Sequence, residues 1–128
     1  MPHLPELPHA DPTRAFRYRD GLYAVDLVSA ALAEFDFFTW LGRNAGVGAG
    51  EIGAALGMAA RPLDVLLTLG KANGWIAEAG GAYSLTTSGT AFLSADSVWS
   101  LAPYYQSLKD RRIHLDMVEV LRSGKPAN

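Results

Sequence analysis

The chain has 128 residues, a formal net charge of −2 and 49% hydrophobic residues, a composition typical of a globular protein. A chain of this length builds one core, which excludes a cofactor-binding domain and a substrate domain together. The absence of cysteine excludes disulfides, a thiolate nucleophile and cysteine-ligated metal centres. Charges interrupt every apolar stretch and the N-terminus has no basic start, so we expect a soluble, cytoplasmic protein without a membrane segment.

The first twelve residues form a proline-rich segment. It holds four of the seven prolines and two of the three histidines. Prolines at this density do not permit a helix, and the segment has little apolar surface to bury. We therefore predict a flexible arm over residues 1–12 and a single domain over residues 13–128.

Helical patterns follow the arm. A helix can begin near Thr13, because Pro12 is tolerated in a first turn and Asp11 or Thr13 can cap it. Beyond Gly21, apolar residues at a helical spacing predict a buried face made by Tyr23, Leu27, Ala30 and Ala31. A second short helix is predicted around Phe35, Phe38 and Leu41.

The middle of the chain has the pattern of a helix-turn-helix. A short helix is predicted over residues 51–56, ending at Gly57 in a left-handed conformation, and a second helix runs from about Arg61 to about Asn73. The glycine-rich residues 44–50 predict a plain connection and not a phosphate-binding loop. A helical segment precedes them and Glu51 follows, whereas a phosphate loop follows a strand.

Two short strands follow this helix pair. Residues 75–78 and 82–85 favour strands, and the glycines between them allow the positive φ of a hairpin turn. Thr86 can cap a helix over residues 87–93. The order helix, turn, helix, hairpin is that of a winged helix. We therefore predict a mainly α fold, a winged helix-turn-helix with a two-stranded β-hairpin wing and additional N- and C-terminal helices.

Two further helices are predicted after the hairpin. One covers about residues 99–108 and is bent or restarted at Pro103. The last spans Arg111 to Ser123 and ends at a Gly-Lys-Pro stop signal. Its apolar face is predicted to contain Ile113, Met117, Val120 and Leu121.

The charges of the winged helix bear on its function, because many winged helices bind DNA. Between residues 45 and 94 the basic residues are Arg61 and Lys71, and they are outnumbered by Glu51, Asp64 and Glu78. A DNA duplex is bound by several cations that neutralise phosphates. The acidic balance therefore disfavours nucleic-acid binding and favours a structural role or a contact with protein.

Five short motifs occur in a fixed order along the chain: Phe35-Asp36, Leu56-Gly57, Asn73-Gly74-Trp75-Ile76, Tyr83-Ser84-Leu85-Thr86 and Thr90-Ala91-Phe92-Leu93. Taken in this order, they resemble the N-terminal dimerisation domain of S-adenosylmethionine-dependent small-molecule O-methyltransferases. The resemblance covers about residues 20–125, and the C-terminal SGKPAN is similar to the linker into the family's catalytic domain.

The resemblance implies a homodimer and a small acceptor with an aromatic or polyketide-like hydroxyl. S-adenosylmethionine is expected in a Rossmann-like catalytic domain that this chain does not contain. We therefore expect this chain alone to be non-catalytic and to bind no cofactor. Its carboxylates do not cluster, so no metal site is expected. Two alternatives remain open: a winged-helix DNA-binding regulator, and a stand-alone small-molecule-binding dimer.

Aromatic residues are the candidates for these contacts. Seven of them crowd into the first 40 residues, more than short helices can bury, so we predict a dimer interface, with ordinary core packing as the alternative. The predicted interface consists of Phe16, Tyr23, Phe35, Phe37, Phe38, Trp40, Ile113 and Leu121. The predicted acceptor-binding residues are Trp99, Tyr104, Tyr105 and Met117, with core packing as the alternative for Trp99. His114 is expected to be a packed or surface residue and not a general base.

Overall fold

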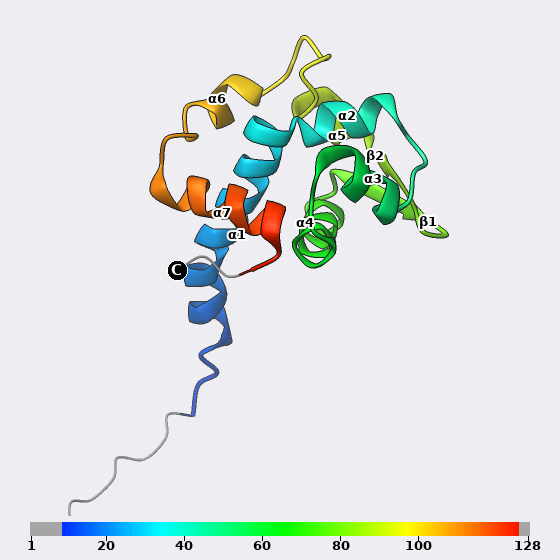
Figure 1. Cartoon of the computed structure of the whole chain (residues 1–128). Coiled ribbons are helices and arrows are strands. Elements are labelled where there is room, and N and C mark those ends of the chain that lie inside the picture. Colours follow the sequence, from blue (N-terminus) through cyan, green and yellow to red (C-terminus); the bar gives the residue numbers. More distant parts are fainter. Residues whose placement is uncertain (1–8, 126–128) are drawn as a thin grey trace, which may run out of the picture.

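The computed structural model describes residues 9–125, and for residues 16–23 it describes the backbone alone. The predicted arm therefore lies largely outside the described residues. Helices and one two-stranded antiparallel sheet make up the described part (Figure 1). In chain order the elements are α1 (Thr13–Phe35), α2 (Phe37–Arg43), α3 (Ala49–Leu56), α4 (Ala60–Ala72), β1 (Ile76–Ala79), β2 (Ala82–Leu85), α5 (Thr87–Phe92), α6 (Ala102–Gln106) and α7 (Arg112–Ser123).

A single residue separates α1 from α2. Asp36 adopts a left-handed conformation with φ 54° and ψ 35°, which aspartate tolerates better than most residues. The resulting change of direction turns Phe37 and Phe38 into the interior. Their rings pack edge to face, with centroids 4.9 Å apart and ring planes at 83°. This break thus directs two of the largest side chains of the chain into the core.

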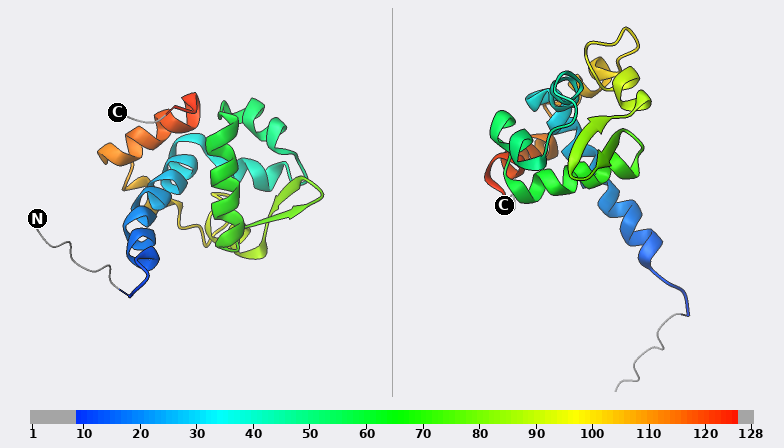
Figure 2. Two further views of the ribbon diagram at one scale, coloured as in Figure 1. Left: turned by 90° about the horizontal axis from the view of Figure 1, so that it is seen from below. Right: turned by 90° about the vertical axis from the view of Figure 1, so that its right-hand side faces the viewer.

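The core joins the helices at both ends of the chain to the helix-turn-helix. α7 packs along α1, and α4 contacts both of them (Figures 1 and 2). The largest apolar side chains that are fully buried are Phe37, Phe38, Leu41, Ile52, Leu63, Leu66, Leu67 and Leu121. Because they come from α2, α3, α4 and α7, and Ala30 and Ala31 of α1 are buried in the same core, the terminal helices and the helix-turn-helix form one unit.

The helix-turn-helix and the hairpin follow the prediction. α3 ends at Gly57, whose φ is 70°, and α4 follows at an angle of 115°. In the hairpin, Gly80 and Gly81 have positive φ, as expected. The side chain of Thr86 caps α5 by accepting a hydrogen bond from the Gly89 amide at 3.1 Å. The predicted mainly helical fold is confirmed, and its order of elements is consistent with a winged helix.

A third segment adds to the hairpin. Val47 forms an isolated antiparallel bridge with Tyr83 of β2. The Tyr83 amide donates to the Val47 carbonyl at 2.8 Å, and the Gly46 amide donates to the Tyr83 carbonyl at 2.8 Å. The glycine-rich connection between α2 and α3 is therefore tied to the outer edge of β2, as expected of a connection.

The segment after α5 differs from the prediction. A helix was expected over residues 99–108, bent or restarted at Pro103. α6 starts beside Pro103 and covers only Ala102–Gln106, so residues 99–101 are not helical. Three serine hydroxyls, those of Ser94, Ser97 and Ser100, each accept a hydrogen bond from the amide two residues later. Such local bonds satisfy the backbone without a helix, so they hold residues 94–101 in successive turns.

The buried face of α7 also differs from the prediction. His114, Val118 and Leu121 are buried, whereas Ile113 and Met117 are half-buried. The face is rotated because polar side chains of α7 meet polar partners on α1. Apolar spacing alone could not indicate that a histidine belongs to the core.

No single helix within residues 9–125 has the length and apolar character to cross a membrane. Only α3 and α4 counted together would pass that test, and they are bent against each other by 115°.

Candidate functional site

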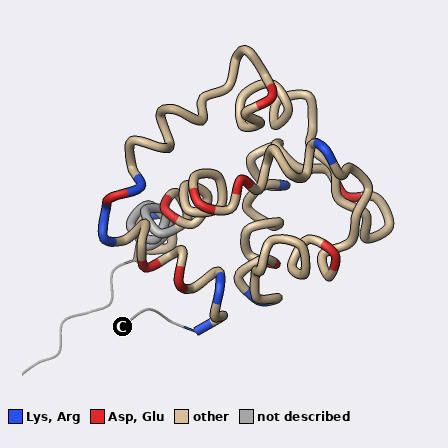
Figure 3. The backbone as a smooth tube through the Cα atoms, turned by 45° about the horizontal axis from the view of Figure 1, so that its top comes forward, with Lys and Arg blue, Asp and Glu red and all other residues tan. Residues whose placement is uncertain are grey.

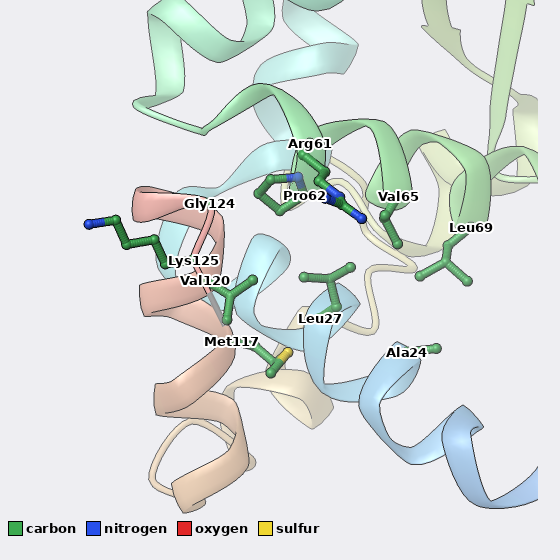
Figure 4. A pocket seen from close by; sticks show the side chains of 10 residues that line it. All are labelled: Ala24, Leu27, Arg61, Pro62, Val65, Leu69, Met117, Val120, Gly124 and Lys125. Carbon is green, nitrogen blue, oxygen red and sulfur yellow. The ribbon is translucent and has the colours of Figure 1, made fainter. Parts of the chain in front are cut away.

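An apolar groove of about 540 Å³ runs between α1, α4 and α7 (Figure 4). It is lined by Ala24, Leu27, Arg61, Pro62, Val65, Leu69, Met117, Val120, Gly124 and Lys125. A smaller hollow of about 200 Å³ shares Ala24 and Leu69 with it and ends at Trp75 and Tyr105. Together the two hollows follow α4 along its side that faces α1.

Two described ionisable residues line this groove, and both are cations. Arg61 extends its guanidinium over the groove toward Val65, whereas Lys125 points away from it (Figure 4). No carboxylate or imidazole is among the described lining residues. General acid–base chemistry requires such a group within hydrogen-bonding reach of the reacting atoms. Among the described residues, the lining of the groove is thus mostly apolar, with a positive charge at its rim.

Buried polar side chains connect α1 to α7. Asp26, fully buried, accepts a hydrogen bond from Arg111 Nη1 at 2.8 Å. Three residues further along each helix, Ser29 Oγ lies 3.2 Å from His114 Nδ1. Residues three apart lie on one helix face, so the two contacts lie next to each other along the interface between α1 and α7. We call these four residues the polar seam.

His114 in the polar seam is enclosed between α1 and α7. The side chain is fully buried, and burial lowers the pKa of His114, against the opposing effect of the carboxylates of Glu34 and Asp26. Within the described residues, His114 Nε2 and Asp26 Oδ2 have no hydrogen-bond partner. Of the two expectations for His114, a packed residue is confirmed and a surface residue is wrong.

A second apolar feature lies at the opposite end of α1 from the arm. The segment from Val98 to Tyr104 carries large apolar side chains into solvent, with Val98 93% and Trp99 72% exposed. Leu101 and Tyr104 are also exposed. Isolated exposed apolar residues are common, whereas a continuous exposed apolar segment is typical of a contact surface.

Charges on the rest of the molecule are mixed. Figure 3 shows Lys and Arg interspersed with Asp and Glu along the described backbone. In the helix-turn-helix and hairpin, Lys71 Nζ lies 2.7 Å from Glu78 Oε1. Among the described residues no three His, Cys, Asp or Glu side chains group as metal ligands.

No family model and no curated protein matches the chain, but solved structures do. An O-methyltransferase family 2 protein from Planctomyces limnophilus, in complex with apigenin, matches 92% of this chain with a TM-score of 0.85 and 25% identity. PigF with S-adenosylhomocysteine matches 80% with a TM-score of 0.67 and 26% identity. Human N-acetylserotonin methyltransferase in complex with S-adenosylmethionine matches 84% with a TM-score of 0.63 and 18% identity.

The predicted resemblance is thereby confirmed. The chain has the fold of an O-methyltransferase dimerisation domain. It spans about a third of the length of the methyltransferases that it matches, 35% of the Planctomyces protein and 33% of PigF.

This dimerisation-domain fold does not bring the four predicted acceptor-binding residues together. Met117 lines the groove, and Tyr105 lines its smaller continuation. Trp99 and Tyr104 lie on the exposed segment, so the core alternative for Trp99 is wrong. Tyr104 is exposed and Tyr105 half-buried, because neighbouring residues of a helix point in different directions.

Three predicted interface residues of the dimerisation-domain fold require correction. Phe37, Phe38 and Leu121 are fully buried inside the single chain, so a partner cannot contact them. The left-handed Asp36 directs both phenylalanines inward, and Leu121 packs beneath the helix-turn-helix, where its carbonyl accepts from the Ala59 amide at 2.7 Å. For these three residues the alternative of ordinary core packing holds.

The other predicted interface residues remain open to a partner or are not described. Phe35, Trp40 and Ile113 are half-buried. The Arg122 guanidinium lies 5.4 Å from the ring centroid of Phe35 and covers part of it. Phe16 and Tyr23 lie outside the residues whose side chains the structure describes.

The polar seam and the groove were not found from the sequence. Asp26 did give a signal, since it interrupts the apolar pattern on both sides of it in α1. An acid at such a position indicates a buried partner, but the sequence does not show that the partner is Arg111, 85 residues away.

Proposed function

We propose that this chain is the dimerisation and acceptor-contacting domain of a S-adenosylmethionine-dependent O-methyltransferase, or is derived from one. The observation that carries the proposal is the match over 92% of the chain to a methyltransferase whose complex holds apigenin, a flat phenolic compound. In this proposal the hairpin is the wing of a winged helix, and α1 and α7 are the additional dimerisation helices.

The chain alone carries out no methyl transfer in this proposal. A base must be positioned beside an open substrate site, and His114 is enclosed between α1 and α7. A nucleotide-like cofactor needs a strand, a glycine-rich loop and an acidic contact to its ribose, as in a Rossmann-like domain. We therefore assign S-adenosylmethionine to a separate catalytic domain.

The exposed segment supplies the proposed acceptor wall. Trp99 and Tyr104 are exposed on it and Tyr105 follows directly. Aromatic rings with a hydroxyl or N–H tip bind flat aromatic ligands by stacking and one hydrogen bond. The proposed acceptor is therefore a small aromatic or polyketide-like molecule with a free hydroxyl. Met117 faces the groove and is not part of this wall.

The proposed homodimer rests on α1. The first turns of this 23-residue helix extend beyond the other helices (Figures 1 and 2), and further along it Val25 is 51% exposed. A helix that projects from its own fold gains burial by packing against a second copy, and in a symmetric pair each copy uses the same surface.

Light scattering at micromolar concentration tests the homodimer. The chain should have twice its mass of 13.7 kDa. Val25→Asp should shift it toward the monomer, because one charge enters the interface twice. The control is Val98→Asp, the same substitution at an exposed position of the segment from Val98 to Tyr104, and it should leave the mass unchanged. A monomeric parent chain would contradict the dimer.

Titration with apigenin tests the acceptor wall. Apigenin should quench the fluorescence of the exposed Trp99, and Trp99→Ala should remove that change while Trp40→Phe retains it. S-adenosylmethionine should give no heat of binding in calorimetry. Tight binding of the cofactor, or quenching that survives in Trp99→Ala, would contradict the assignment.

The DNA-binding alternative has less support. Of the two basic residues between positions 45 and 94, Lys71 is already paired with Glu78, which leaves Arg61. Duplex binding through one cation would be weak. A mobility-shift assay with random duplex at low salt should show no complex; a tight, salt-sensitive complex would favour the regulator.

A further inference from the structure

The segment between α5 and α6 is a closed loop. We call residues 93–101 the serine loop, because a serine stands at every third position within it: Ser94, Ser97 and Ser100. At its base the Leu101 amide donates a hydrogen bond to the Phe92 carbonyl at 2.7 Å. The loop thus has the size and the closed ends of an Ω-loop. Figure 1 shows it beyond α5, leading into α6.

The first half of the serine loop is fixed to α2. The Ala95 amide donates to Thr39 Oγ1 at 2.8 Å. One turn further along α2, Arg43 Nε and Nη2 donate to the two carboxylate oxygens of Asp96, at 2.8 and 2.6 Å. Residues four apart lie on one face of a helix. Thr39 and Arg43 therefore hold two consecutive loop residues on the same face of α2.

The second half of the serine loop carries the exposed apolar side chains. Val98 is 93% and Trp99 72% exposed. The Trp99 amide donates to Ser97 Oγ at 3.1 Å. Among the described residues, those from 97 to 100 form hydrogen bonds only within the loop and with Ala102. The direction in which Trp99 points thus depends on the position at which the first half of the loop is held.

The pair of Arg43 and Asp96 acts on the orientation of the loop more than on the stability of the fold. Their side chains are 64% and 50% exposed, so water solvates either charge when the other is removed. A forked guanidinium–carboxylate pair, however, fixes the relative rotation of its two groups as well as their distance. A surface that is ordered before its ligand arrives loses less entropy on binding.

We propose that Arg43 is a positioning residue of the serine loop. By holding Asp96 in a forked pair on α2, it fixes the direction in which Trp99 faces an aromatic acceptor. Arg43 acts through the loop and does not contact the acceptor itself. Its role in acceptor binding rests on the proposed acceptor wall, whereas its role in ordering the loop rests on the contacts of the loop alone.

Hydrogen exchange of the whole chain, measured by NMR, tests the ordering of the loop. The amides of Trp99 and Leu101 donate within the loop and at its base. In Arg43→Ala both should exchange about threefold faster than in the parent chain, as expected for losing an exposed ion pair. The matched control is Lys71→Ala, which removes another paired cation, bonded to Glu78 at 2.7 Å on α4 and the hairpin. It should leave both exchange rates unchanged.

A charge swap separates the pair from other effects of losing Arg43. Arg43→Asp places two carboxylates side by side and should raise the two exchange rates more than Arg43→Ala does. The double variant Arg43→Asp/Asp96→Arg restores opposite charges and should return the rates toward those of the parent. Equal rates in the parent and in Arg43→Ala, or a double variant as fast as Arg43→Asp, would overturn the positioning role.

Titration with apigenin, followed by Trp99 fluorescence, tests the consequence for the acceptor. The Kd of Arg43→Ala should be about twofold to threefold higher than that of the parent, because the ligand must then order the loop itself, and Lys71→Ala should keep the parent value. An unchanged Kd in Arg43→Ala would overturn the effect on the acceptor. A parent chain without quenching would overturn that effect together with the acceptor wall, and the exchange rates would then decide separately whether Arg43 orders the loop.

Discussion

Replacing Arg111 with alanine should destabilise the fold more than replacing Arg43, although Arg43 makes the better ion pair. Arg43 holds Asp96 through two bonds, of 2.8 and 2.6 Å, whereas Arg111 holds Asp26 through one bond of 2.8 Å. The pairs differ in the carboxylate. The Asp26 side chain is 1% exposed, and the Asp96 side chain is 50% exposed.

The magnitude follows from that difference. Removing one partner of a fully buried ion pair costs about 3 to 5 kcal/mol, because an uncompensated charge is left inside. The Arg111 side chain is itself 45% exposed, so water can partly take its place. We therefore expect Arg111→Ala to lower the free energy of unfolding by about 2 kcal/mol. Arg43→Ala should produce a change within experimental error, because water solvates Asp96 without it.

Urea unfolding followed by circular dichroism measures both changes, and a double-mutant cycle isolates the pair. Asp26→Asn removes the buried charge, so Asp26→Asn/Arg111→Ala should be more stable than Arg111→Ala alone. If Arg111→Ala and Arg43→Ala lose the same stability, or if Asp26→Asn does not rescue the former, burial of the carboxylate is not the cause.

Three further predictions concern single positions. Gly89→Ala should lower the free energy of unfolding by about 2 kcal/mol, because the added Cβ would collide with the Trp75 carbonyl oxygen. Gly50→Ala, which has open space around it, should raise the free energy of unfolding by about 0.5 to 1 kcal/mol, because alanine favours a helix. The same urea assay measures both changes. Acid should destabilise the fold: the pKa of His114 is held below the usual 6.5, so the unfolded chain takes up the proton first and the free energy of unfolding falls as pH decreases through 6.5. Urea midpoints at pH 7.5 and 5.5 measure this fall, which should be smaller in His114→Gln. Phe37→Asp should leave the chain unfolded at 25 °C by circular dichroism, since the ring is fully buried; a folded, merely monomeric variant would restore this residue to the interface.

Local patterns predicted the helix-turn-helix and the hairpin because their signals are local. Gly57 can be recognised as a helix end from its place after an apolar helix, and Thr86 as a cap from the helix that follows. The helix prediction for residues 99–101 was wrong because the serines around them can favour either a helix or a turn. Tertiary contacts select one of these two conformations, and the local sequence does not show which.

The candidate site was harder to predict than the fold. An apolar side chain such as Phe37 looks the same in sequence whether it faces the core or a partner. The density of aromatic residues therefore indicated that they are buried, but not whether the core or a second chain buries them. The groove depends on three helices that are far apart in sequence. Val65 and Met117, which line it together, are 52 positions apart in the chain.

The bridge between Val47 and Tyr83 has a consequence for how this protein behaves when it is concentrated. A sheet edge with free amides and carbonyls is a template on which another chain can add a strand, the first step of fibril growth. The Gly46 amide donates to the Tyr83 carbonyl and the Val47 carbonyl accepts from the Tyr83 amide, so this edge of β2 is closed by its own chain. β1 is four residues long and carries Glu78 at its centre, which leaves a short and charged edge. Aggregation of the overproduced domain should therefore begin at the exposed apolar surfaces of its helices and not at the edges of its sheet.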